Sequence, residues 1–468
     1  MREGEPLPLP GFLKRFFELW KGAGLADAYL VGGYVRNLLL GLAEGDLDIA
    51  SPELPQKVAR KLQCEEVCVE ERAYGLGTVV IKQRFGERLY VYEYTAFRCD
   101  NYGRGGAHTP VSVAFTQDMD LDAQRRDFTI NALYMGADGR VADPTGRGLA
   151  AIGNRLVEQV TEETLAQDAL RILRMVRFAA ELGFEIDGQT YACAKRYAPQ
   201  LQDISAERIR DEFFKILLAD QKYGNTDGVL CGLHLLKDLG ALRFIVPRLE
   251  DGDGLAQNPN YHAHDVLEHS LRACACAPPD LEVRLAALLH DIAKPEAWHE
   301  TGKMYGHDKL GAVLAEQALS ALRVDKETTR HVCALVRAHM FDLNNDAGKR
   351  AVIRMIAKLG QEQFLKLCAV READFCGSGM GNPPLSAEKW RGILEELVSR
   401  DAPLNLRQLA VNGDDLMREL DLPAGKRIGE LLQALHAYAL KKPSQNNYKS
   451  LIKYAKIINT CEYKPEKN

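Results

Sequence analysis

Two aspartates one position apart, a short distance after a double glycine, constrain this chain more than any other feature of its sequence. The apolar segment Tyr29–Val31 predicts a strand, and Gly32 and Gly33 permit a sharp turn after it. Asp46 and Asp48 fall on the next predicted strand, where alternate side chains point to one face. Two neighbouring carboxylates repel each other unless a cation lies between them, and Mg²⁺ prefers oxygen ligands of this kind. Two such ions, about 3.5–4 Å apart, can hold the attacking and leaving oxygens of a nucleotidyl transfer.

The double glycine suggests a phosphate site. Without side chains, Gly32 and Gly33 let backbone N–H groups approach a phosphate, and the predicted helix Val35–Leu40 would present its N-terminus to it. Arg36 could add positive charge. On these residues alone, a plain strand–turn–helix with an acidic surface turn is equally compatible.

A second charged motif lies in the segment Arg125–Leu133. Two adjacent arginines, the second being Arg126, present planar forks of donors that suit a triphosphate or an RNA phosphate. Asp127 can accept from ribose hydroxyls, and Asn131 can position a sugar. Taken alone, the cluster would more often be a group of solvated charges at the start of a helix.

A third motif lies on the predicted helix Leu165–Leu182, which Gly183 would end. Asp168 and Arg171 are helical neighbours at i, i+3, and so are Arg171 and Arg174. A carboxylate beside a guanidinium can match the Watson–Crick edge of a base. An ordinary intrahelical ion pair is the commoner explanation when such a pair stands alone.

Together, the three motifs resemble those of CCA-adding enzymes (tRNA nucleotidyltransferases) and the related bacterial poly(A) polymerases, which belong to the DNA polymerase β superfamily. The blocks LVGGYVR to DLD, RRDFTINAL and DALRILRMVRF follow one another in the family's order and at plausible distances. Similarity of this kind extends from about Tyr29 to about Tyr454. It implies that the enzyme uses amino acids, rather than a nucleic-acid template, to select C, C and then A.

The resemblance also assigns roles to residues. It implies that Asp46 and Asp48 are catalytic and bind Mg²⁺, and that Asp168 and Arg171 pair with the incoming CTP or ATP. Glu93 is a candidate third carboxylate. The expected nucleotide-binding residues are Gly32, Gly33, Arg36, Arg126, Asp127, Asn131, Asp168, Arg171 and Arg174.

Three positions depart from the family pattern. Asn37 stands where the family usually has Asp, and Gln167 where it usually has Glu. Both changes leave the metal carboxylates and the Asp168–Arg171 pair intact, so we expect tuning rather than loss. The loop Arg104–Pro110 lacks the usual pair of arginines, and this loop takes part in the family's switch from C to A addition. A poly(A) polymerase, or an enzyme that adds only CC or only A, therefore stays an alternative.

Histidines concentrate in the third quarter of the chain: eight of the eleven lie between His262 and His339. Imidazole and carboxylate together form a ligand set for Mn, Fe, Ni, Zn or Mg, and more nitrogen favours the softer metals. The set that stands out is His269, His290, Asp291 and Asp374. It resembles the H…HD…D signature of the HD phosphohydrolase domain, and His307 and His339 fall where two-metal members of that family place further ligands. The resemblance implies a divalent metal at these six residues, and the sequence does not give its identity. A fold of this type that no longer binds metal is the alternative, and for His262, His264, His299 and His331 we expect ordinary surface or hydrogen-bonded imidazoles.

The net charge of −5 limits nucleic-acid contact to local patches, and the last stretch provides one. From Pro423 to Asn468 there are nine Lys or Arg against three Glu. The expected RNA-binding residues, interleaved with tyrosines, are Lys441, Lys442, Lys449 and Lys453. For any single lysine, a solvated helix surface is nearly as good an explanation.

Eleven cysteines without a CxxC pair argue against a disulfide framework or a zinc knuckle and favour a cytoplasmic protein. No signal peptide or apolar run near 18 residues is present, so no membrane span is expected.

We therefore predict an α+β protein of 468 residues in four parts. These are a mixed α/β nucleotidyltransferase head (1–150), a helical neck that selects the base and binds RNA (151–255), an HD phosphohydrolase-like domain (256–380) and a helical tRNA-binding tail (381–468). The predicted activity is CCA addition to tRNA from CTP and ATP. An RNA-binding HD phosphohydrolase without polymerising activity is the alternative from another class, and the sequence does not give the oligomeric state.

Overall fold

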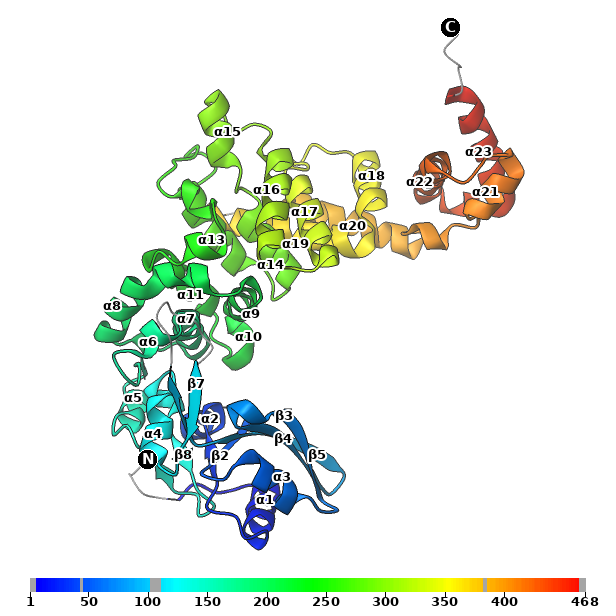
Figure 1. Ribbon diagram of the computed structural model, residues 1–468. Coiled ribbons are helices and arrows are strands. Elements are labelled where there is room, and N and C mark those ends of the chain that lie inside the picture. Colours follow the sequence, from blue (N-terminus) through cyan, green and yellow to red (C-terminus); the bar gives the residue numbers. More distant parts are fainter. Residues whose placement is uncertain (1–5, 43–44, 102–110, 382–384, 463–468) are drawn as a thin grey trace. The chain divides into compact units, whose positions relative to one another are not determined.

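The computed structural model describes residues 6–42, 45–101, 111–381 and 385–462 (Figure 1). The chain divides into an N-terminal unit, Met1–Pro247, and a C-terminal unit, Arg248–Asn468. Every strand of the described residues belongs to the N-terminal unit, whereas the described part of the C-terminal unit is helical. The predicted α+β fold class is therefore confirmed. The division into four domains stays a prediction.

The N-terminal unit is built on a seven-stranded sheet in the order β3-β4-β5-β2-β1-β8-β9. Its strands are β1 Tyr29–Val31, β2 Leu47–Ser51, β3 Val67–Ala73, β4 Thr78–Phe85, β5 Arg88–Ala96, β8 Tyr134–Met135 and β9 Val141–Ala142. Neighbouring strands are antiparallel except β2 and β5, which are parallel. The β-branched and aromatic residues of the sequence predict strands at Tyr29–Val31, Leu47–Ala50, Thr78–Lys82 and Leu89–Tyr94, which fall on β1, β2, β4 and β5; β3 was not predicted. Because β2 is the middle strand, Asp48 on it is held from both sides.

An aromatic cluster covers part of this sheet. Helix α1, Gly11–Gly22, places aromatic residues at helical spacing on one face, which predicts burial of that face. The ring of Phe12 stacks on Tyr90 at 3.9 Å between centroids, and Phe16 stacks on Tyr92 at 4.4 Å. These contacts fix the position of β5, which is the strand that pairs with β2 beside Asp48.

Helices make up the rest of the N-terminal unit. They are α2 Gly33–Leu40, α3 Pro55–Leu62, α4 Met119–Gln124, α5 Gly148–Gly153, α6 Thr164–Gln167, α7 Leu170–Leu182, α8 Gly188–Tyr197, α9 Ala206–Leu217, α10 Ala219–Tyr223, α11 Gly228–Asp238 and α12 Leu242–Ile245, with 3-10 turns η1 Tyr74–Leu76, η2 Thr129–Asn131 and η3 Ala198–Asp203. Two small sheets join β6 Arg98–Asn101 with β7 Ser112–Phe115, and β10 Leu156–Val157 with β11 Glu185–Ile186.

Two local predictions after residue 162 were wrong. The helix predicted over Leu165–Leu182 is two helices, α6 and α7, because Asp168 adopts an extended backbone between them. Its Oδ1 accepts the N–H of Leu170 at 3.0 Å and so satisfies a donor of the first turn of α7. The second error concerns strands: the helical pattern from Glu162 onward predicted none, but β11 lies there and pairs with β10 over two residues. Gly183 does end α7, with φ of 63°.

The described part of the C-terminal unit consists of α13 Val266–Cys276, α14 Leu281–Leu289, α15 Lys294–Thr301, α16 His307–Ala321, α17 Lys326–Ala338, α18 Lys349–Leu359, α19 Gln361–Gly377, α20 Leu385–Ser399, α21 Gly413–Leu420, α22 Lys426–Lys441 and α23 Tyr448–Glu462, with 3-10 turns η4 Leu249–Gly252, η5 Leu406–Gln408 and η6 Pro443–Gln445. The last helices share an apolar core that includes Leu416, Leu431, Leu435 and Leu451. The stripe expected on the helix after Lys426 lies in this core.

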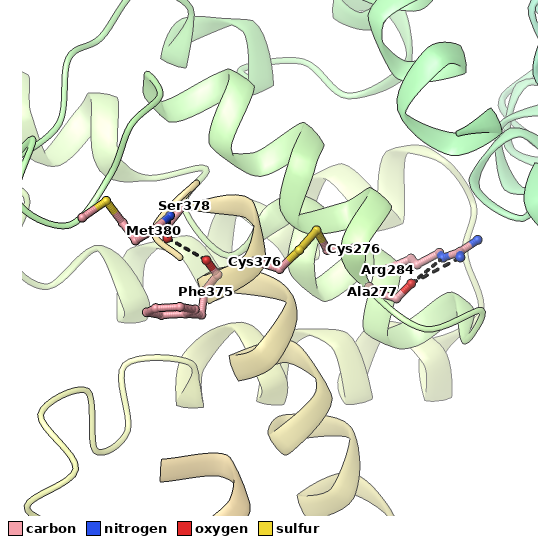
Figure 2. Close-up of a disulfide and its surroundings, with 7 residues drawn as sticks. All are labelled: Cys276, Ala277, Arg284, Phe375, Cys376, Ser378 and Met380. Atoms are coloured by element: carbon pink, nitrogen blue, oxygen red, sulfur yellow. Dashed lines mark hydrogen bonds between the residues drawn. A yellow bond between two sulfur atoms is a disulfide. The ribbon is translucent and has the colours of Figure 1, made fainter. Parts of the chain in front are cut away.

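One disulfide joins Cys276 to Cys376, although neither the cysteine count nor the spacing predicted it (Figure 2). The two cysteines are 100 residues apart in the sequence, and a pairing over that distance leaves no local pattern. The described helices include none with the length and apolarity needed to cross a bilayer, as the sequence predicted.

Gly228 lies where α7 and α11 pack too closely for a larger side chain. A Cβ at this position would lie 2.5 Å from the carbonyl oxygen of Ala180, a backbone atom that cannot move aside. We expect Gly228→Ala to destabilise this part of the N-terminal unit by about 1–3 kcal/mol. Hydrogen exchange of α7 and α11, measured by mass spectrometry, checks this. The matched control is Gly188→Ala, where a Cβ meets nothing within 4 Å, and equal protection in both variants would contradict the packing argument.

Candidate active site and metal centre

The glycine turn lies directly against Asp48. Gly32 has φ of 72°, a left-handed conformation that favours glycine, and α2 begins at the next residue. A Cβ on Gly32 would lie 3.3 Å from Oδ2 of Asp48, and Val31 is the strand partner of Asp48. The N-terminus of α2 therefore lies beside the Asp48 carboxylate.

The three carboxylates of the head differ in their surroundings. Asp46 precedes β2 and is exposed, whereas Asp48 lies within the strand and is paired in register with Glu93 on β5. Burial raises the pKa of Asp48 to about 6; Arg126 opposes this shift, and the negative charges of Glu93 and Asp46 add to it. Glu93 is exposed and forms an ion pair with Arg72. A cation beside Asp46 and Asp48 would relieve their repulsion, so the donor set suits a hard, oxygen-binding ion.

Arg36 is buried rather than directed at an open phosphate site. Its Nη1 donates to Oδ1 of Asn131 at 2.9 Å, and its Nη2 donates to Oδ1 of Asn37 at 2.8 Å and to the Tyr223 hydroxyl at 3.1 Å. The Asn37 amide also donates to Tyr223 at 2.9 Å. The Asn37 side chain therefore accepts a hydrogen bond through its amide oxygen and donates one through its amide nitrogen. This placement favours a structural role for Arg36 over the predicted phosphate contact.

Asp127 is the centre of a second buried network. Its Oδ2 accepts from Nε and Nη2 of Arg174 at 2.8 and 2.6 Å, and its Oδ1 accepts from the Asn131 amide at 3.2 Å. Burial opposes ionisation of Asp127, but the positive charge of Arg174 outweighs it and lowers the pKa to about 2. The structure thus brings Asp127, Asn131 and Arg174 together.

Arg126 is engaged with neighbours of its own segment. Its Nε donates to the Tyr134 hydroxyl at 2.8 Å, and its Nη2 donates to Oδ2 of Asp122 at 3.1 Å. Since Tyr134 also donates to Asp122 at 2.6 Å, the three side chains hold one another. Arg126 still influences Asp48 through its charge.

Asp168 and Arg171 lie close together at the start of α7, where the backbone N–H of Arg171 donates to the carbonyl of Asp168 at 3.0 Å. Arg171 donates from Nη1 to the carbonyl of Thr164 at 3.1 Å and from Nη2 to the carbonyl of Arg125 at 2.7 Å. Oδ2 of Asp168 lies 3.6 Å from Nη2 of Arg208 on α9. Both Asp168 and Arg171 are buried. Arg171 is therefore held by backbone carbonyls from two separate segments of the N-terminal unit.

Sequence reasoning missed Arg208 and Tyr223. Both act across long sequence distances, Arg208 on Asp168 and Tyr223 on Arg36 and Asn37. Neither belongs to a short motif of its own, so no local pattern indicated it. The predicted loop Arg104–Pro110 falls on positions 104–110, outside the described residues.

A second cluster of ligands lies in the C-terminal unit. Among the described residues, the groups of three or more metal-type ligands whose donor atoms all lie within 4.8 Å are His269–His290–Asp374 and Asp291–His307–His339. All six were predicted from the sequence, and all six are buried. They come from α13, α16 and α19 and from the residues that follow α14 and α17.

Asp291 connects the two groups. Its Oδ2 lies 3.2 Å from Nε2 of His290, and its Oδ1 lies 3.2 Å from Nε2 of His307. In the first group, Nε2 of His269 lies 3.0 Å from Nε2 of His290. Asp374 completes it, with Oδ1 at 3.1 Å from Nε2 of His269. One carboxylate with an oxygen toward each group has the arrangement of a bridging ligand.

Hydrogen bonds from Nδ1 to backbone carbonyls fix the orientation of three imidazole rings of this cluster and the tautomer of each ring. Nδ1 of His290, His307 and His339 lies 2.6–2.7 Å from the carbonyl oxygens of Ala287, Met304 and Val336. A carbonyl only accepts, so each Nδ1 donates and each Nε2 of a neutral ring carries a lone pair. Nε2 of His307 and Nε2 of His339 nevertheless face each other at 3.1 Å. Facing lone pairs are stable only with a cation or a proton between them.

The buried carboxylates of this cluster favour the binding of a cation. Both oxygens of Asp291 are buried without a hydrogen-bond donor of suitable geometry, although Nζ of Lys294 lies 2.6 Å from Oδ2. Burial lowers the pKa of His290, but Asp291 and Asp374 outweigh it and raise that pKa. In the metal-free protein a proton can therefore take the cation's place at Nε2 of His290, and metal binding would release it. The residues fit a divalent metal with nitrogen and oxygen ligands.

One histidine expected to be ordinary lies beside this cluster. The ring of His262 contacts that of His269 at 4.6 Å between centroids, and burial lowers its pKa to about 4. Its Nδ1 is buried without a hydrogen-bond partner. His331, in contrast, has an acceptor in Glu282 at 2.8 Å, as expected.

The basic tail has the predicted surface. Lys441, Lys442, Lys449 and Lys453 are all exposed. Tyr438 stacks on Tyr454 at 4.0 Å between centroids, and Nζ of Lys442 lies 5.7 Å from the Tyr438 ring.

Family models match three parts of the chain. Residues 28–158 match the poly A polymerase head domain, residues 183–252 a probable RNA and SrmB-binding site of polymerase A, and residues 296–455 a putative domain 2 of tRNA nucleotidyltransferases. The sheet with its glycine turn and paired carboxylates is thus a nucleotidyltransferase head.

Relatives match over nearly the whole length. The A-adding tRNA nucleotidyltransferase of Deinococcus radiodurans is 32% identical over 428 residues, covering 87% of this chain and 90% of that protein. The CC-adding tRNA nucleotidyltransferase of Thermus thermophilus is 32% identical, covering 87% and 88%. The Bacillus stearothermophilus CCA-adding enzyme, solved in complex with CTP, has a TM-score of 0.69 at 27% identity over 97% of this chain and 98% of that one. The chain therefore belongs to the family of tRNA nucleotidyltransferases and bacterial poly(A) polymerases.

Ionised Asp48, the form that would bind a metal, lowers the free energy of unfolding, because burial raises its pKa in the folded state. A carboxyl titrates near about 3.9 when unfolded, whereas Asp48 titrates near about 6 in the fold. Between these values the folded state keeps a proton that the unfolded state has lost, so the free energy of unfolding falls as pH rises and stays lower above pH 6. We expect Asp48→Asn, which cannot ionise, to be more stable than the parent by about 1–3 kcal/mol at pH 8 without metal.

Calorimetric unfolding at pH 4 and pH 8 in a chelator measures this difference, which should shrink at the lower pH. Asp27→Asn, an exposed acidic position of the same unit, should change stability little at either pH. A gain for Asp48→Asn that is equal at both pH values would rule out titration as its cause.

Proposed function

We propose that this protein adds C, C and A to the 3′ ends of tRNA from CTP and ATP without a nucleic-acid template. The observation that carries the proposal is the position of Asp48, which lies against a glycine turn at the start of α2 with Asp46 beside it. Membership of the tRNA nucleotidyltransferase family supports the same activity. The substrates, tRNA and nucleoside triphosphates, agree with the cytoplasmic location expected from the sequence.

In this reaction the RNA 3′-hydroxyl attacks the α-phosphate of the nucleotide and pyrophosphate leaves. Asp46 and Asp48 are the residues that would hold Mg²⁺, which when bound lowers the pKa of the hydroxyl and stabilises the leaving pyrophosphate. The backbone N–H groups at Gly32 and Gly33 lie where a triphosphate would approach Asp48. Strand β2 holds Asp48 between two neighbouring strands, and Asp46 directly precedes this strand.

Base selection is assigned to Asp168 and Arg171. Their support comes from both sides of the junction between head and neck: Arg208 faces Asp168, and backbone carbonyls hold Arg171. A guanidinium and a carboxylate that are fixed in this way can present a donor and an acceptor to a base edge at a constant spacing. Arg126, Asp127, Asn131 and Arg174 would act on the nucleotide mainly by keeping this surface in place.

Partial addition is the second candidate within the same chemistry. Relatives of 32% identity include both an A-adding and a CC-adding enzyme, and the altered loop at 104–110 favours keeping this possibility open. Poly(A) addition is the third outcome that the same active site could produce.

We also propose that the C-terminal cluster is an HD-type phosphohydrolase centre whose six residues would hold divalent metal. The support is the position of Asp291 between the two histidine groups and the lone pairs that face each other there. A metal in this centre would activate water to attack a phosphoester. A 2′,3′-cyclic or 3′-terminal phosphate on RNA is the substrate class that would suit the head, because the head needs a free 3′-hydroxyl.

The tail lysines complete the proposed interaction with tRNA. Lys441, Lys442, Lys449 and Lys453 would contact phosphates, which read the shape of the RNA rather than its sequence.

We expect Asp46→Ala and Asp48→Ala each to reduce nucleotide addition by at least about 10³-fold, because the remaining carboxylate cannot hold the metal ions alone. Incorporation of labelled CTP into tRNA that lacks CCA measures this, and tRNA binding, followed by filter retention, should not change. Asp27→Ala is the control. Normal turnover by either variant would remove the basis of the proposal.

Sequencing of the tRNA ends separates the modes of addition. With CTP and ATP together, full CCA ends support the first proposal, whereas CC ends or a single A identify a partial enzyme and long A tails a poly(A) polymerase. Phosphatase activity without any magnesium-dependent incorporation would identify an RNA-binding phosphohydrolase instead.

Asp291→Asn tests the second centre. Loss of the bridging charge should lower phosphatase activity on 3′-phosphorylated RNA by at least about 100-fold and leave CCA addition to a 3′-hydroxyl end unchanged. Asp308→Asn, a change of the same type next to His307, is the control. Equal phosphatase activity in Asp291→Asn and its parent would contradict the assignment.

A further inference from the structure

The disulfide Cys276–Cys376 joins α13 and α19, two of the helices that carry residues of the C-terminal cluster (Figure 2). Cys276 is the last residue of α13, which holds His269 about two turns earlier. Cys376 is the next-to-last residue of α19, two positions after Asp374. The Cα atoms of the cysteines are 6.1 Å apart. The bond thus connects the supports of His269 and Asp374, whose Nε2 and Oδ1 atoms lie 3.1 Å apart.

The two helices meet backbone to backbone at this point. A Cβ on Gly377 would lie 2.5 Å from the backbone nitrogen of Ala273, so α19 and α13 are in direct contact beside the disulfide. Such contact transmits a change at the helix ends to the ligands one or two turns away.

Neighbouring hydrogen bonds hold each helix end separately. Arg284 donates to the carbonyl of Ala277, just after α13, from Nη2 at 3.2 Å, and the hydroxyl of Ser378 donates to the carbonyl of Phe375 at 2.6 Å (Figure 2). Neither bond joins α13 to α19. The disulfide is the covalent connection between the helices, beside the packing of Gly377 on Ala273 and the polar contact of His269 with Asp374.

The disulfide is open to reagents. Cys276 and Cys376 are both exposed, in contrast to the buried ligands. Exposed disulfides are the ones that thiols in solution reduce most readily, and in reducing compartments such bonds are commonly regulatory.

We propose that Cys276 and Cys376 form a redox switch on the C-terminal metal centre. The disulfide holds His269 and Asp374 in register and strengthens metal binding, and its reduction by a dithiol weakens that binding. The inference rests on the metal centre proposed above.

The chemistry is thiol–disulfide exchange. A thiolate of the dithiol attacks one sulfur of the pair, which breaks the protein's S–S bond and forms a mixed disulfide. The second thiol of the reagent then displaces the remaining cysteine. Two electrons and two protons pass from the dithiol to the protein, so Cys276 and Cys376 end as thiols and the reagent as a cyclic disulfide. Oxidation by a small disulfide reverses the exchange.

The expected effect is graded. Packing of Gly377 on Ala273 remains after reduction, so the centre loosens rather than disappears. Loss of a supporting interaction around a metal ligand commonly costs about 10–100-fold in affinity. We therefore expect reduction to weaken binding by about tenfold or more.

Titration of the full-length protein with Mn²⁺, followed by the electron paramagnetic resonance of free Mn²⁺, tests the proposal. The Asp48→Asn background removes uptake by the head. The samples are the oxidised protein, the same protein after treatment with dithiothreitol and its removal under nitrogen, and Cys276→Ser. Cys333→Ser, at a half-buried cysteine of α17 outside the disulfide, is the matched control.

Binding about tenfold tighter in the oxidised protein than in the reduced protein and in Cys276→Ser, with Cys333→Ser switching like its parent, supports the proposal. Equal affinity in the oxidised and reduced forms overturns the switch while leaving the metal centre in place. No Mn²⁺ binding in any form overturns the centre and the switch together. Absence of the Cys276–Cys376 peptide from a non-reducing digest of the oxidised sample also overturns the switch.

Discussion

The carboxylate of Asp127 is the point on which the geometry of the N-terminal unit depends. It accepts two hydrogen bonds from Arg174 on α7 and one from Asn131, which in turn accepts from Arg36 on α2. The chain of bonds therefore runs from α7 to α2, the helix that starts at the glycine turn. Removal of one partner of a buried pair leaves an uncompensated charge, which costs about 3–5 kcal/mol. The distance between the glycine turn and α7, which carries the proposed base-selecting residue Arg171, is consequently fixed by the fold.

The buried polar cluster of the C-terminal unit differs from the Asp127–Arg174 pair, because its side chains do not neutralise one another. Nε2 of His307 faces Nε2 of His339, and Oδ1 of Asp291 is buried without a hydrogen-bond donor. Bonds from three Nδ1 atoms to backbone carbonyls prevent the rings from turning to find other partners. A cation would satisfy these groups at once. In the N-terminal unit, therefore, side chains neutralise one another, whereas the proposed metal would complete the C-terminal cluster.

Sequence predicted the parts of both sites that short motifs encode. The glycine turn, Asp46 and Asp48, and all six ligands of the C-terminal cluster could be named, because each lies in a local pattern tied to a known chemistry. Arg208, Tyr223 and the Cys276–Cys376 bond could not, because each acts on residues distant in the sequence. Arg36 shows a further limit: its position in a phosphate-type turn indicated a ligand contact, but the direction of its side chain depends on Tyr223 from the neck.

The same limit explains the two helices predicted as one. Apolar spacing continues from α6 into α7, so periodicity alone could not reveal the break. The break nevertheless matters for the site, because the extended backbone at Asp168 lets its Oδ1 cap α7 while Oδ2 faces Arg208. On an uninterrupted helix, Asp168 would bond to Arg171 and leave less of either side chain for a base.

Ligand chemistry also separates the two proposed metal sites. Asp46 and Asp48 offer only oxygen, which suits Mg²⁺. The C-terminal cluster offers four imidazoles and two carboxylates, a set that favours transition metals. Each site therefore selects its own ion from a common pool. Metal binding at either site would release a proton, because an imidazole must be neutral to bind a metal and Asp48, whose pKa is raised to about 6, must ionise.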